Sequence, residues 1–137
     1  MKIKLKGRSV YRGMAEGEAI VTQENLSGWG GVNPDTGIVI DKFHELYGKC
    51  LKDKILIFRG AKGSSGWANT FHICRLRKTT PAGIIFTELT PKLCLGIIVM
   101  KIPAITDLEK DPFTLIKTGD YIKINGNNGE VTIIKNK

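Results

Sequence analysis

One stretch of the sequence constrains the fold most: an apolar run, a glycine-rich turn and a helical pattern in direct succession. Ile55–Phe58 is apolar at every position, which is typical of a strand buried on both faces. The turn, Gly60–Gly66, contains three glycines and two serines. Apolar residues then recur at helical spacing, at Trp67, Phe71 and Cys74. This order predicts a strand that leads through a tight turn into a helix.

Further apolar runs follow this helix. Ile84–Phe86 and Ile97–Met100 indicate two more buried strands. A strand, a helix and another strand in succession predict parallel β-α-β pairing. Near the C-terminus, Tyr121–Ile124 and Val131–Ile134 flank a loop of asparagines and glycines. Because those residues tolerate positive φ, this segment predicts an antiparallel hairpin.

The N-terminal segment has the period of a strand. Lysines alternate with apolar residues over Lys2–Lys6, which indicates a half-buried strand with one solvated, charged face. We expect this strand to continue to Tyr11 and the chain to turn at Gly13–Glu16. A second strand is predicted at Glu18–Thr22 and another at Ile38–Ile40, beyond a loop of low apolar content.

Together these elements predict one α/β domain that spans residues 1–137. Its central sheet would be partly parallel and would stack on a second, antiparallel sheet built from strands of both termini, with a few helices beside them. A chain of this length buries roughly two thirds of its unfolded surface, so a substantial apolar core is expected.

The charge balance limits the classes of partner that the protein is expected to bind. Lys and Arg number 21 against 13 Asp and Glu, which leaves a net charge of +8 and favours an anionic partner. The longest apolar run, Leu93–Met100, has eight residues, whereas a membrane-spanning helix needs about 20. The charged N-terminus has no apolar stretch behind it, so no secretory signal is expected. We expect a soluble, cytoplasmic protein that does not bind a membrane.

The three cysteines, Cys50, Cys74 and Cys94, do not form a disulfide or zinc-binding pattern. Three thiolates can in principle hold an iron–sulfur cluster with one open iron. Cys74, however, falls on the apolar face of the predicted helix, and Cys94 lies inside an apolar segment. We therefore expect this chain to bind no metal.

The glycine-rich turn is the first candidate site. A helix N-terminus offers unpaired N–H groups and a partial positive charge, and Lys62 adds a full charge beside it. Together they predict a site for a phosphate or a carboxylate. The order of residues differs from a Walker P-loop, because Lys62 precedes the second glycine. The alternative is a tight turn whose serine merely caps the helix.

The second candidate is Ser27-Gly28-Trp29-Gly30-Gly31. Glycines around a tryptophan indicate either a tight turn with an anchoring aromatic or a loop in which Trp29 recognises a ligand. His44 lies in a polar segment and is expected at the surface.

These motifs, in this order, resemble the small subunit of the aconitase X family over nearly the whole chain. The matching segments are 13–19, 26–37, 62–65, 81–85, 102–104 and 117–120. The resemblance implies a swivelling β/β/α domain and a partner, a large subunit that carries a 4Fe-4S cluster and most of the substrate site. The family more often has an aromatic where Gly28 stands and an aspartate where Asn33 stands, which weakens any acid–base role for position 33.

The resemblance also implies an activity, the removal of water from a small anionic hydroxy acid. Archaeal members of this size dehydrate (R)-5-phosphomevalonate to trans-anhydromevalonate 5-phosphate; bacterial members dehydrate cis-3-hydroxy-L-proline, which is the alternative here. The family's motif places the catalytic base on Ser64, which leaves Ser65 as the expected helix cap. The residues expected to bind substrate are Lys62, Gly63, Ser65, Ser27, Gly30 and Gly31.

Two hypotheses from other classes remain. A basic nucleic-acid-binding module would gather cations and exposed aromatics on one face, but aromatics make up only 7% of the chain and no RNA-binding or helix-turn-helix signature is present. A purely structural scaffold for the large subunit would leave turnover independent of Ser64.

Overall fold

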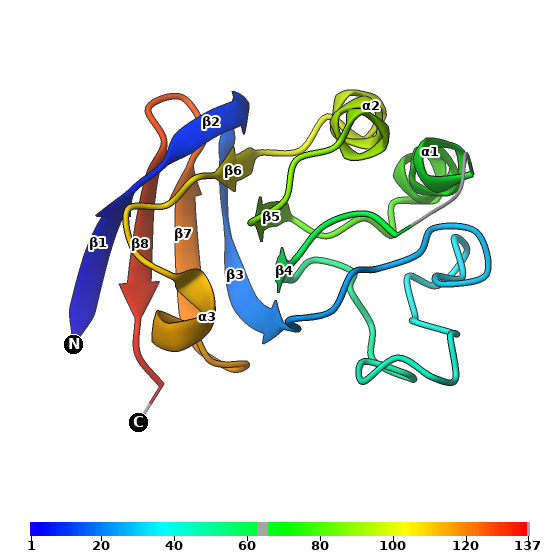
Figure 1. Ribbon diagram of the computed structural model, residues 1–137, viewed down its shortest axis with the longest axis horizontal. Helices are drawn as coiled ribbons and strands as arrows, with labels where there is room; N and C mark the ends of the chain where they lie inside the picture. The colour runs from blue at the N-terminus through cyan, green and yellow to red at the C-terminus, as the bar shows by residue number, and fades with distance from the viewer. Residues whose placement is uncertain (63–65, 137) are drawn as a thin grey trace.

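The structure, a computed structural model, describes residues 1–62 and 66–136. Three layers lie side by side: an antiparallel sheet, a mixed sheet and a pair of helices (Figure 1). The layers follow from the sequence because the central strands of the mixed sheet, Ile55–Phe58 and Gly83–Phe86, are buried at every position, whereas the C-terminal strands of the antiparallel sheet alternate between more exposed and buried residues.

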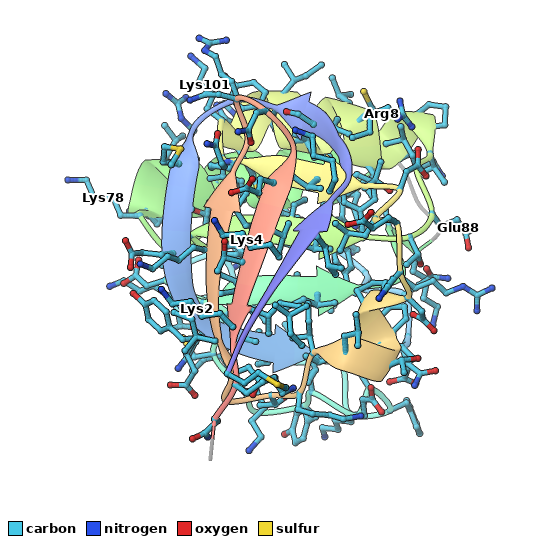
Figure 2. The ribbon with its side chains drawn as sticks, turned by 90° about the vertical axis from the view of Figure 1, so that its left-hand side faces the viewer. Lys2, Lys4, Arg8, Lys78, Glu88 and Lys101 are labelled. Carbon is cyan, nitrogen blue, oxygen red and sulfur yellow. The ribbon has the colours of Figure 1, made fainter. Side chains whose placement is uncertain are left out.

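The antiparallel sheet contains β1 (Lys2–Lys6), β8 (Glu130–Ile134), β7 (Tyr121–Asn125) and the first part of β3 (Met14–Val21). The predicted C-terminal hairpin is confirmed, with Ile122 opposite Ile133. β1 pairs antiparallel with β8 and forms the outer edge of this sheet. Lys2 and Lys4 project from this layer into solvent, as the alternating pattern predicted (Figure 2).

The first predicted strand is interrupted at Gly7. Beyond it, β2 (Arg8–Tyr11) passes to the mixed sheet and pairs with β6 (Ala104–Thr106). A Cβ at Gly7 would lie 2.8 Å from the Thr106 carbonyl oxygen, so the crossing requires glycine. The predicted turn at Gly13–Glu16 is wrong in its extent, because Gly13 turns with φ +117° and β3 already begins at Met14.

The mixed sheet contains the end of β3, β4 (Ile55–Phe58), β5 (Gly83–Phe86), β6 and β2, in that order. β3, β4, β5 and β6 run parallel, and α1 (Trp67–Arg77) connects β4 to β5, which confirms the predicted β-α-β unit. The strand predicted at Ile38–Ile40 is wrong: Ile38 and Val39 form isolated bridges to Cys50 and Val32 instead.

The mixed sheet separates two apolar cores. Ile55 and Ile57 of β4 face the antiparallel sheet, whereas Leu56 and Phe58 face the helices. Every residue of β4 is therefore buried, which explains its continuous apolar run. The predicted fold class, a partly parallel central sheet stacked on an antiparallel one, is confirmed.

The second helix corrects a prediction. Ile97–Met100, expected as a strand, forms the end of α2 (Pro91–Met100). Thr90 caps this helix by accepting a hydrogen bond from Leu93 N–H at 3.3 Å, and Pro91 occupies its first turn. A short helix, α3 (Pro112–Leu115), precedes β7. None of the helices in the described residues has the length and apolar character needed to cross a bilayer.

α1 and α2 pack closely where Gly96 meets the Trp67 ring. A Cβ at Gly96 would lie 2.1 Å from one ring carbon of Trp67, so the indole fills the space that a side chain would take. Trp67 is almost fully buried and also packs on Phe71, with ring centroids 4.3 Å apart.

We predict that Gly96→Ala destabilises the protein, although alanine favours a helix more than glycine does. The added methyl must displace the Trp67 ring, and overpacking of this kind costs about 1–3 kcal/mol. Urea unfolding measures the effect, with Leu95→Ala at an exposed position of the same helix as control. An unchanged or higher free energy of unfolding for Gly96→Ala would contradict the packing argument.

The buried carboxylate of Asp120 links the residues just before β7 to those just after β8. It accepts hydrogen bonds from the N–H groups of Lys117 and Asn136, both at 2.9 Å, and from Lys135 Nζ at 2.6 Å. Lys135 Nζ also donates to the Leu115 carbonyl at 2.7 Å. Burial alone would raise the pKa of Asp120, but these hydrogen bonds and the Lys135 charge outweigh it and hold the pKa below its ordinary value.

Because the folded-state pKa of Asp120 is lowered, its carboxylate stabilises the fold above the unfolded-state pKa of about 3.9, and this stability is lost as the pH falls through the folded-state pKa. We therefore expect Asp120→Asn to cost on the order of 2 kcal/mol at neutral pH and much less in acid. Urea unfolding of both proteins, measured from neutral pH down into acid, tests this expectation, with a substitution of the exposed Asp35, Asp35→Asn, as control. A cost independent of pH would contradict the prediction.

Candidate functional site

The parallel pairing of β3 and β4 continues beyond the ends of both strands. Thr22 N–H donates to the Ile57 carbonyl at 2.9 Å, and Leu26 N–H donates to the Gly60 carbonyl at 2.9 Å. Lys62 N–H then donates back to the Leu26 carbonyl, also at 2.9 Å. The segments 22–26 and 59–62 are thus prolongations of two neighbouring strands, at the carboxyl ends where open α/β sheets bind ligands.

The Leu26 carbonyl is also tied to α1. The buried indole of Trp67 donates its Nε1–H to this oxygen at 2.8 Å. One carbonyl therefore holds the segment after β3, the segment after β4 and the first residue of the helix together.

The Ser27–Gly31 loop sits directly against the first turn of α1. A Cβ at Gly28 would lie 2.7 Å from Trp67 Cα, and one at Gly66 would lie 3.0 Å from Trp29 Cβ. The loop closes on itself through bonds from Gly31 and Val32 N–H to the Gly28 carbonyl, at 3.0 and 3.1 Å. The two candidate motifs, separate in the sequence, are therefore neighbours in space.

The predicted site residues fall into two groups. Among the described residues, Ser27 is half-buried, Gly30 is exposed with φ +76°, Gly31 is buried and Lys62 is exposed. Gly63, Ser64 and Ser65 lie outside the described residues. The structure assigns the N-cap of α1 to Gly66, and the expectation that Ser65 caps this helix falls outside the described residues.

The electrostatics of the helix start suit an anion. The first turn of α1 carries no acidic residue, so its partial positive charge is not neutralised by its own side chains. Its basic residues, Arg75 and Arg77, occupy the last turn, where cations suit the helix dipole.

Trp29 does not anchor the loop in the core, because its side chain is 80% exposed. It borders a hollow of about 350 Å³ whose walls include Gly66, Ile40 and Ile73. The interpretation of Trp29 as an anchoring aromatic is wrong, and a role in recognition stays a prediction.

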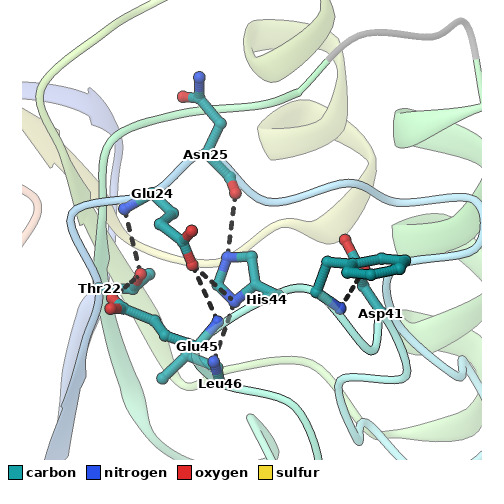
Figure 3. Close-up of polar contacts among 8 residues, drawn as sticks. Thr22, Glu24, Asn25, Asp41, His44, Glu45 and Leu46 are labelled. Atoms are coloured by element: carbon teal, nitrogen blue, oxygen red, sulfur yellow. Dashed lines mark hydrogen bonds and ion pairs between the residues drawn. The ribbon is translucent and has the colours of Figure 1, made fainter.

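His44 is not at the surface, contrary to the prediction. It is 8% exposed, and its Nε2 lies 3.0 Å from the Asn25 carbonyl oxygen (Figure 3). Its polar neighbours in the sequence gave no signal of this burial, since Asn25 lies 19 residues earlier in the chain.

The described residues contain no group of three or more His, Cys, Asp or Glu side chains placed to hold a metal ion. The three cysteines occupy different environments: Cys50 is exposed, Cys74 buried and Cys94 half-buried. Burial raises the pKa of the Cys74 thiol, as expected for a core residue on the apolar face of α1. An iron–sulfur cluster held by these three thiols does not fit this structure.

Comparison with known proteins gives consistent results along the chain. Residues 4–133 match the model of the aconitase X swivel domain. The chain is 38% identical to a protein of Methanococcoides burtonii and 36% identical to one of Pyrococcus furiosus, covering 96% of both chains in each comparison. Both relatives are named phosphomevalonate dehydratase small subunit.

Two solved structures share the fold. The holo-form of Thermococcus kodakaraensis aconitase X matches with a TM-score of 0.90 and 34% identity, over 97% of this chain and 99% of that one. The solution structure of a UPF0107 protein matches with a TM-score of 0.86 and 33% identity, over 97% and 100% of the two chains.

We predict that Gly28→Ala lowers the free energy of unfolding more than Gly30→Ala does. A Cβ at position 28 must push the loop away from the Trp67 backbone, at a cost of about 1–3 kcal/mol, whereas position 30 is open and costs only the strain of its positive φ, about 1 kcal/mol. Thermal and urea unfolding of both variants compare them. Equal stabilities, or a more stable Gly28→Ala protein, would contradict the close approach.

Proposed function

This chain belongs to the aconitase X swivel-domain family, since the family model matches residues 4–133, and from this premise we propose that it is the small subunit of a phosphomevalonate dehydratase. The enzyme is a hydro-lyase that converts (R)-5-phosphomevalonate to trans-anhydromevalonate 5-phosphate, a step of isoprenoid synthesis. The relatives named phosphomevalonate dehydratase small subunit, at 35–39% identity over nearly the full length, carry this proposal.

The reaction requires two bonds to break. A proton leaves the carbon next to the carboxylate, and the hydroxyl on the neighbouring carbon departs as water once it is protonated. We propose that a large subunit forms a heterodimer or a higher assembly with this chain and holds a 4Fe-4S cluster, whose open iron supplies Lewis-acid chemistry at the hydroxyl. This chain's own contribution is then to bind the anionic substrate and to remove the proton.

The substrate-binding part of the proposal rests on the neighbouring loops. Lys62 supplies a full charge, and the start of α1 supplies a partial one without an acidic residue nearby in its first turn. Ser27, Gly30 and Gly31 lie on the loop packed against that turn. We assign these residues, with Gly63 and Ser65, to binding a carboxylate or phosphate of the substrate.

Ser64 is the proposed base. A free serine hydroxyl is far too weak a base at neutral pH, so its alkoxide must be stabilised. Ser64 lies in the sequence between Lys62 and Gly66, and the charge of the first and the helix that begins after the second are the two stabilising groups that this chain offers. The proposal treats residues 1–137 as one swivel domain in the cytoplasm, and the three free cysteines support that location.

We predict that Ser64→Ala lowers turnover of phosphomevalonate by at least about 10²-fold in the complex reconstituted with its large subunit, because the proton acceptor is removed. Assembly, measured by size-exclusion chromatography with light scattering, should be unchanged. Ser9→Ala, on the edge strand β2, is the serine control, because it removes a hydroxyl that donates to the Gly126 carbonyl and that belongs to neither candidate loop.

Two results would count against this assignment. Near-full activity of Ser64→Ala would place the base elsewhere and leave this chain as a scaffold. Turnover of cis-3-hydroxy-L-proline in place of phosphomevalonate by the wild-type complex would transfer the function to the alternative substrate.

A further inference from the structure

Both ring nitrogens of the buried His44 are engaged. Leu46 N–H donates to Nδ1 at 3.0 Å, and Nε2 lies 3.0 Å from the Asn25 carbonyl oxygen (Figure 3). Because Nδ1 accepts a hydrogen bond, the geometry assigns the proton to Nε2, which donates to Asn25. The imidazole is therefore a neutral bridge between the loop 41–46 and the segment that follows β3.

The loop is itself held beside this segment. Glu24 Oε1 accepts a bond from Glu45 N–H at 2.9 Å and lies 3.6 Å from His44 Nδ1. The Thr22 hydroxyl donates to the Glu45 carboxylate. The position of His44 thus follows from contacts that a substitution at position 44 leaves in place.

Asn25 is the point where this bridge reaches the site. The N–H and carbonyl of Leu26 both point to the segment 59–62, so the carbonyl of Asn25, one residue earlier, points to the opposite edge. A strand prolongation with one unpaired edge opens readily, and His44 supplies the missing partner on that edge.

We propose that His44 is a positioning residue of the dehydratase site. Its neutral imidazole holds the Asn25 carbonyl and thereby keeps Leu26 paired with Lys62 and Trp67, which sets the place of Ser27 beside the helix start. The consequence for catalysis rests on the proposed function, whereas the consequence for the pairing does not.

Two substitutions separate the two bonds of the imidazole. In His44→Asn, the side-chain oxygen stands near Nδ1 and still accepts from Leu46 N–H, but no group reaches Asn25. In His44→Gln, the side-chain amide stands near Nε2 and still donates to the Asn25 carbonyl, but Leu46 loses its acceptor. If His44 only stabilises its own loop, His44→Asn should have the smaller effect, because it keeps the bond from Leu46. If His44 positions the site, His44→Gln should have the smaller effect, because it keeps the bond to Asn25.

The first measurement is hydrogen exchange, by NMR, of the Lys62 amide and the Trp67 indole in the full chain. We expect His44→Asn to raise exchange of both by about tenfold, the factor that corresponds to one hydrogen bond, and His44→Gln to leave it near the wild-type rate. The Ile85 amide in the core reports global unfolding, so any rise there measures the overall stability that each variant loses and is the reference for the Lys62 and Trp67 protons. Unchanged exchange in His44→Asn, or equal increases in the two variants, would overturn the proposal.

The second measurement is phosphomevalonate turnover by the reconstituted complex. We expect His44→Asn to lower kcat/KM by on the order of 10²-fold, the cost of a misplaced binding group, and His44→Gln to retain most of it. Thr79→Val removes a buried side-chain bond to the Pro34 carbonyl in the same long loop and should leave kcat/KM unchanged. If Thr79→Val lowered kcat/KM as much as His44→Asn does, the effect of His44→Asn would reflect a general loss of stability, and the positioning role would be overturned. An inactive wild-type complex would refute the proposed function, and the exchange measurement would still decide the pairing.

Discussion

The Leu26 carbonyl oxygen accepts hydrogen bonds from both Lys62 N–H and the Trp67 indole, and the arrangement of the candidate site depends on this shared oxygen. The two loops follow different strands, and within the described residues neither 22–32 nor 59–62 contains a helix or a named strand. Without the shared acceptor, their relative position would depend on loop packing alone. With the shared acceptor, the loops extend the parallel pairing of β3 and β4, and the hydrogen bonds of the sheet hold them in place.

The distribution of charge matters more to this site than the net charge of +8. Lys2 and Lys4 lie on the outer face of the antiparallel sheet, on a layer separated from the site by the mixed sheet (Figures 1 and 2). In solvent at physiological salt such distant charges are largely screened beyond about 8 Å. The local features, the helix start without acidic residues and Lys62 at the end of the ladder, are the ones that favour an anion.

Local patterns predicted the parts of the fold that depend on neighbouring residues. The Ile55–Phe58 strand, the helix from Trp67 and the C-terminal hairpin each carry their own period and turn signals, and all three are confirmed. Ile97–Met100 was predicted wrongly because α2 is apolar on nearly all sides: Ile97 and Met100 are buried, but Ile98 is 54% exposed. Periodicity cannot separate such a helix from a buried strand, and only the Thr90-Pro91 start signal distinguishes them.

The same limit applies to the site. Sequence patterns identified both glycine-containing loops as candidates, but their contact depends on the ladder from Thr22 to Lys62, which no local pattern encodes. The burial of His44 depends on the return of a loop 19 residues later to the free edge of that ladder. Long-range hydrogen bonds of this kind join residues whose own sequence neighbourhoods are polar and unremarkable.

Gly28 connects these constraints to the family resemblance, which leads us to expect an aromatic more often than a glycine at this position. Here a Cβ at residue 28 would lie 2.7 Å from Trp67 Cα and 3.0 Å from its carbonyl oxygen, so an aromatic fits only if the first turn of α1 moves away. Such a movement would pull the Trp67 indole from the Leu26 carbonyl, which it reaches at 2.8 Å. In this chain, glycine allows the helix to approach and the neighbouring Trp29 takes the exposed place beside the site. The residue at position 28 therefore affects how closely the start of α1 approaches the Leu26 carbonyl, and with it the geometry of the proposed anion site.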